Sequence, residues 1–154
     1  IGHVQTNKVK FMAPFVSLIH GVDSLKLLKE INRQAVRWRK NINCLLQIHI
    51  AEEETKFGLD EKEVNEILNS EEFKNLENIR IVGLMGMATF TDNKDQIKKE
   101  FQNLKTIFDK VSQLKTENCQ LNTISMGMSG DYQLAIECGS TMVRIGSSIF
   151  GNRK

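Results

Sequence analysis

Short apolar runs alternate with longer amphipathic segments along the whole 154-residue chain. Runs of four to eight apolar residues that end at glycine or at polar clusters predict β-strands. Six such runs are present, at residues 1–5, 15–20, 44–50, 79–87, 121–126 and 141–145.

The segments between these runs have helical periodicity, most clearly at residues 94–115. There Ile97, Phe101 and Leu104 belong to one apolar stripe of three- and four-residue steps, and Asp92 or Asn93 is placed to cap the helix. The same reasoning predicts a helix that begins near Asp23 or Ser24 and ends near Trp38, one over 60–70 with Asp60 as its cap, and one over 130–138.

Alternation of strands and helices predicts a parallel sheet, because parallel strands need crossover connections. Six strand–helix units fit an open doubly wound sheet, whereas a (β/α)₈ barrel needs eight and would place two units upstream of Ile1. Both folds place ligand chemistry at the carboxyl ends of the strands.

Composition narrows the function classes. The net charge is only +2, which gives no reason to expect nucleic acid or an acidic membrane surface as a partner. The three cysteines, Cys44, Cys119 and Cys138, are not clustered, so we expect reduced thiols in a cytoplasmic protein and no metal site. No stretch approaches the length of a membrane span.

Residues 124–131 are the first segment that suggests chemistry. A strand ends there, two glycines and two serines follow, and a helix begins. Glycine lets backbone N–H groups approach an anion, serine adds donors, and a helix N-terminus favours negative charge. An ordinary strand-to-helix turn explains the same pattern equally well.

Residues 140–151 repeat this pattern, with Gly146, Ser147 and Ser148 after a strand. Arg144 is the one charge inside that strand, and a buried arginine is costly unless it meets an anion or a fixed acceptor. An ion pair with Glu137 is one alternative. Two neighbouring turns of this kind with an inward arginine favour a phosphorylated ligand.

Residues 1–8, 125–132 and 139–147 together resemble the pyridoxal 5′-phosphate (PLP) homeostasis proteins, the YggS/PROSC family. The resemblance implies a barrel like the N-terminal domain of alanine racemase. We therefore expect an α/β fold of the (β/α)₈ TIM type, in which residues 1–154 form the C-terminal two-thirds of a single domain.

The resemblance also implies roles for individual residues. Ser125, the backbone of Met126 and Gly127, and Gly146 and Ser147 would bind the cofactor phosphate. Arg144 would face the pyridine nitrogen and keep it unprotonated, because a cation disfavours a second positive charge beside it. A pyridine ring without that proton is a weaker electron sink, which agrees with a non-catalytic PLP carrier. We expect the full-length protein to be a monomer.

The family's Schiff-base lysine lies upstream of the motif at residues 2–5, and no lysine here matches it; Lys8 and Lys56 belong to other family positions. We therefore expect this chain to bind PLP non-covalently and weakly. The alternative functions are an alanine-type racemase, which carries a second domain with a catalytic tyrosine, and a phosphosugar-binding barrel.

Overall fold

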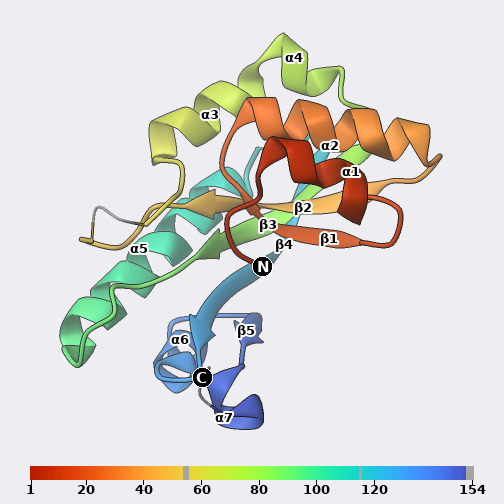
Figure 1. Ribbon diagram of the computed structural model, residues 1–154. Helices are drawn as coiled ribbons and strands as arrows, with labels where there is room; N and C mark the ends of the chain where they lie inside the picture. Colours follow the sequence, from red (N-terminus) through yellow and green to blue (C-terminus); the bar gives the residue numbers. More distant parts are fainter. Residues whose placement is uncertain (54–55, 115, 152–154) are drawn as a thin grey trace.

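The protein is an open, curled sheet of parallel strands with helices packed against it (Figure 1). We describe it from a computed structural model that covers residues 1–53, 56–114 and 116–151. Within these ranges five strands follow one another in chain order across the sheet: β1 (Leu18–Val22), β2 (Ile42–Ile48), β3 (Ile79–Gly86), β4 (Cys119–Met128) and β5 (Met142–Arg144).

Helices connect every pair of neighbouring strands, as parallel pairing requires. The described helices are the 3₁₀ turn η1 (Thr6–Lys8), α1 (Val9–Met12), α2 (Leu25–Arg37), α3 (Glu61–Asn69), α4 (Glu71–Lys74), α5 (Lys94–Val111), α6 (Tyr132–Glu137) and α7 (Ser147–Phe150). No helix in the described ranges is long and apolar enough to cross a membrane.

The core lies between the sheet and the helices. Alternate strand residues such as Ile81 and Ile124 pack there against the apolar stripe of α5, in which Phe101 and Leu104 are completely buried. The predicted caps are confirmed: Ser24, Asp60 and Asn93 each accept a backbone N–H of the helix that they precede.

The predicted strand at residues 1–5 is wrong. Gly2 has a φ of +103°, which breaks an extended run, and Gln5 caps the turn η1. The other five predicted strands are confirmed with shifted ends. The chain therefore contributes five strands of the barrel-type sheet within the described ranges, rather than six.

Glu100 ties two loops at the carboxyl edge of the sheet to α5. Its buried carboxylate accepts the N–H and the hydroxyl of Thr89, after β3, at 2.7 Å each, and the N–H of Glu52, after β2, at 3.1 Å. Burial alone would raise the pKa of Glu100, but these bonds and one from Gln96 lower it overall. The loop that begins at Thr89 is therefore held in place over the site described below.

We predict that Gly83→Ala strongly destabilises the protein. A Cβ at Gly83 in β3 would lie 1.9 Å from the carbonyl oxygen of Thr123 in β4, so the two strands would have to separate. The free energy of unfolding should fall by about 3 kcal/mol in a denaturant titration. Gly130→Ala is the control, because its Cβ would meet nothing within 4 Å; equal losses from both variants would contradict this account.

We predict that Glu100→Gln lowers the free energy of unfolding by about 2 kcal/mol at pH 7, since an amide replaces charge-assisted acceptors. The pKa of Glu100 is lowered in the folded state. The carboxylate therefore contributes fully to the free energy of unfolding above its unfolded pKa, about 4.3. That contribution is lost as the pH falls through the lower folded pKa. The gap between wild type and variant should therefore shrink from pH 5 to pH 3. Glu66→Gln, on the exposed side of α3, is the control and should change stability little.

Candidate functional site

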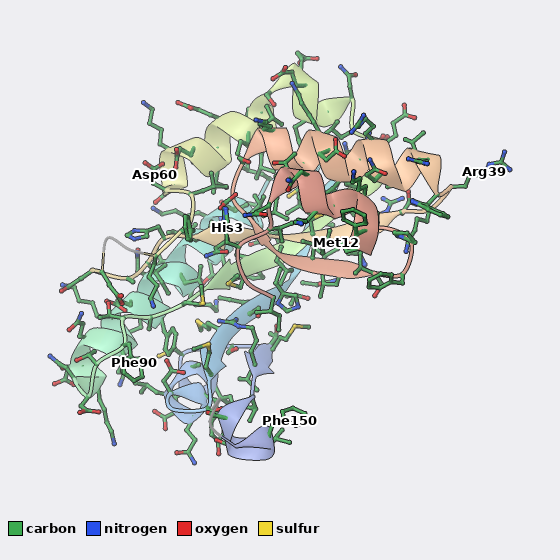
Figure 2. All side chains as sticks on the ribbon, viewed as in Figure 1. His3, Met12, Arg39, Asp60, Phe90 and Phe150 are labelled. Carbon is green, nitrogen blue, oxygen red and sulfur yellow. The ribbon has the colours of Figure 1, made fainter. Side chains whose placement is uncertain are left out.

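Three loops meet around a cavity of about 340 Å³ at the carboxyl ends of β3, β4 and β5. Thr89 and Phe90 come from the loop after β3, Ser129 from the loop after β4, and Arg144 and Gly146 from the end of β5. Figure 2 shows Phe90 on its loop, away from the sheet, and Phe150 on α7. The carboxyl edge is therefore where the predicted ligand segments converge, as parallel α/β sheets require.

Arg144 is the central charge of this site and is only 8% exposed. Its Nη1 donates to the Ser125 hydroxyl at 2.8 Å, and its Nη2 donates to the Gly86 carbonyl at 3.0 Å. Burial lowers the pKa of the guanidinium, and Asp131 opposes that effect. Its hydrogen bonds go to β3 and β4, not to Glu137, the alternative partner that the sequence offered.

One nitrogen of the Arg144 guanidinium has no hydrogen bond within the described ranges. Its Nε is buried and has no hydrogen-bond partner among the residues that the structure describes. A buried donor without a partner costs free energy. The arrangement therefore holds the guanidinium at two nitrogens and leaves the third, Nε, without an acceptor.

Ser125 lies inside the sheet and is fully buried. It pairs with Met85 in β3 and with Met142 in β5. Its hydroxyl accepts the bond from Arg144 and lies 3.4 Å from Nδ1 of His20 in β1. The structure thus places the predicted residues Ser125 and Arg144 in direct contact.

The predicted residues Gly146 and Ser147 lie in a second group, with Ser129. The Ser129 hydroxyl accepts the N–H of Gly146 at 3.2 Å and the N–H of Ser148 at 3.3 Å. We call these residues, Ser129 and 146–148, the serine–glycine turn. Two backbone donors here converge on one oxygen atom, which is how backbone amides bind anions.

Met126 and Gly127 shape the end of β4. The Met126 side chain is buried in the core. Gly127 has a φ of +97°, and a Cβ there would lie 2.6 Å from that of Ala135 in α6. Only glycine fits this close approach. The two residues therefore position the turn at Ser129 through the backbone.

Sequence reasoning gave no individual role to three members of the site: Ser129, the Gly86 carbonyl and His20. Ser129 stands in the predicted glycine–serine segment, and only its pairing with Gly146 distinguishes it from Ser125. A backbone carbonyl has no sequence signal. His20 has no sequence signal either, because no spacing links it to Ser125, 105 positions away.

Comparisons with known proteins show the family of the chain. The family described as "Alanine racemase, N-terminal domain" matches residues 1–154. The "Pyridoxal phosphate homeostasis protein" of Aquifex aeolicus is 36% identical over 154 residues, and the one of Pasteurella multocida is 35% identical over 153. These matches cover 100% and 99% of this chain but 66% and 64% of the relatives, so the chain spans just under two-thirds of their length.

Solved structures show the same fold. PipY of Synechococcus elongatus, with PLP bound, is 27% identical with a TM-score of 0.86, and the match covers 98% of this chain and 68% of PipY. Alanine racemase of Clostridium difficile, in complex with cycloserine, is 19% identical with a TM-score of 0.74, over 99% of this chain and 41% of the racemase, which shows the fold alone. The chain belongs to the alanine racemase N-terminal domain family.

Proposed function

We propose that the protein binds PLP through Arg144 and the serine–glycine turn and holds it as a cofactor carrier in the cytoplasm. The observation that carries this proposal is that Arg144, whose buried Nε has no partner among the described residues, lines the same cavity as the turn. The relatives named pyridoxal phosphate homeostasis proteins, and PipY with PLP bound, support it.

The serine–glycine turn fits a phosphate group. The N–H groups of Gly146 and Ser148 already bind one oxygen, that of Ser129. A Cβ built on Gly146 would meet nothing within 4 Å, so there is open space beside the turn. We propose that Ser129, Gly146 and Ser147 form the phosphate site, with Met126 and Gly127 shaping the loop behind it.

Arg144 fits the ring nitrogen of pyridoxal. Nε is a donor that lacks an acceptor, and an unprotonated pyridine nitrogen is an acceptor. The fixed positive charge disfavours a proton on that nitrogen. Ser125 then acts on the ring side of the site, as the acceptor that holds Arg144, rather than on the phosphate.

The positive charge of Arg144 also supports the proposed carrier function. PLP supplies an electron sink when its ring nitrogen is protonated. Arg144 opposes that protonation and so favours binding without efficient turnover. The alternative, an alanine-type racemase, is supported only by the similarity of the fold to that of alanine racemase. A racemase assay with L-alanine separates the two, and sustained formation of D-alanine would reject the carrier proposal.

We predict that Ser129→Ala weakens the binding of pyridoxine 5′-phosphate roughly tenfold, because one phosphate partner is lost. Pyridoxine 5′-phosphate lacks the aldehyde, so calorimetry reports only non-covalent contacts. Affinity for unphosphorylated pyridoxine should not change. Ser112→Ala, at the exposed end of α5, is the matched control and should bind both compounds like wild type. An equal loss for both compounds would contradict the assignment of Ser129 to the phosphate.

A further inference from the structure

Arg144 is joined to β1 through a hydrogen-bond chain that crosses the interior side of the sheet. Arg144 Nη1 donates to the Ser125 hydroxyl at 2.8 Å, and the same oxygen lies 3.4 Å from Nδ1 of half-buried His20. Three strands supply the three side chains: β1, β4 and β5. The link to His20 is the longer of the two.

The direction of these bonds follows from the atoms involved. Arginine can only donate, so Ser125 Oγ accepts from Arg144. The hydroxyl hydrogen of Ser125 then needs an acceptor, because the residue is fully buried. Nδ1 of a neutral histidine is an acceptor in the tautomer that carries its proton on Nε2, which is the tautomer that this contact requires, whereas Nδ1 of a protonated histidine is a donor. Neutral His20 therefore completes the chain, and protonated His20 would break it.

We propose that His20 is a positioning residue for the ligand site: it accepts the Ser125 hydrogen and so turns that oxygen's lone pairs toward Arg144. With Nη1 held by Ser125 and Nη2 held by Gly86, Nε is the guanidinium nitrogen that has no partner among the described residues. This role rests on the proposed function of Arg144 and extends it to a residue on a distant strand.

The charges around His20 favour its neutral form. Burial lowers its pKa, and so does the guanidinium of Arg144. His20 is thus neutral, and an acceptor, at pH 7. Below its pKa, a second cation would lie beside Arg144 and would compete for the same serine oxygen.

The first test is a double-mutant cycle with pyridoxine 5′-phosphate as the probe. His20→Leu and Ser125→Ala should each weaken binding roughly tenfold, and the double variant should bind no more weakly than Ser125→Ala, because His20 acts only through Ser125. His20→Asn, which retains an acceptor, should recover most of the affinity lost in His20→Leu. His49→Leu, at the end of β2, is the control and should bind like wild type.

Losses that add in the double variant, or a His20→Leu variant that binds like wild type, would overturn the proposal for His20. Failure of the wild-type protein to bind the probe would instead overturn the proposed function. A measurement without ligand keeps the proposal for His20 testable in that case. We expect the pKa of His20, followed by NMR, to rise in Ser125→Ala, since the hydroxyl stabilises the neutral ring. An unchanged His20 pKa would overturn the proposal, with His49 as the internal reference.

Discussion

The guanidinium of Arg144 is buried at the end of β5, where a charge without partners would be strongly destabilising. Its partners are the Gly86 carbonyl at the end of β3 and the Ser125 hydroxyl in β4. Both lie where they do because β3, β4 and β5 are parallel and in a fixed register. The sheet register and the buried charge therefore depend on each other.

The loops at the same edge are held by the same kind of contact, in which a polar side chain binds backbone groups of another segment. Glu100 binds the backbone after β2 and after β3, and Ser129 binds the backbone after β5. Each contact satisfies groups that would otherwise lose hydrogen bonds on leaving water. The cavity is thus built from loops that are held in place, and Arg144, whose Nε has no partner among the described residues, lines it.

The parts of the fold that depend on local sequence patterns are the parts that the sequence predicts. The α5 stripe through Phe101 and Leu104 depends only on helical spacing, and the cap at Asp60 only on its neighbours, so both predictions are confirmed. Residues 1–5 have the composition of a strand, but the left-handed conformation of Gly2 prevents one. Strand composition alone does not specify backbone dihedrals at glycine.

The site was predictable as a region but not as a set of contacts. Glycines and serines after two strands predicted where the turns lie. Which serine faces the Gly146 N–H, and which supports Arg144, depends on the pairing of β4 with β5. The Gly86 carbonyl and His20 are 58 and 105 positions from their partners and leave no pattern in the sequence.

The central claim is that Arg144 donates to an unprotonated ring nitrogen of the bound cofactor. The nitrogen-15 chemical shift of the ring nitrogen in labelled PLP, bound to the protein at neutral pH, tests it most directly. We expect the shift of an unprotonated, hydrogen-bonded pyridine, and a change toward the protonated form in Arg144→Glu, where the cation is replaced by an anion. The shift of a pyridinium nitrogen in the wild-type protein would contradict the account.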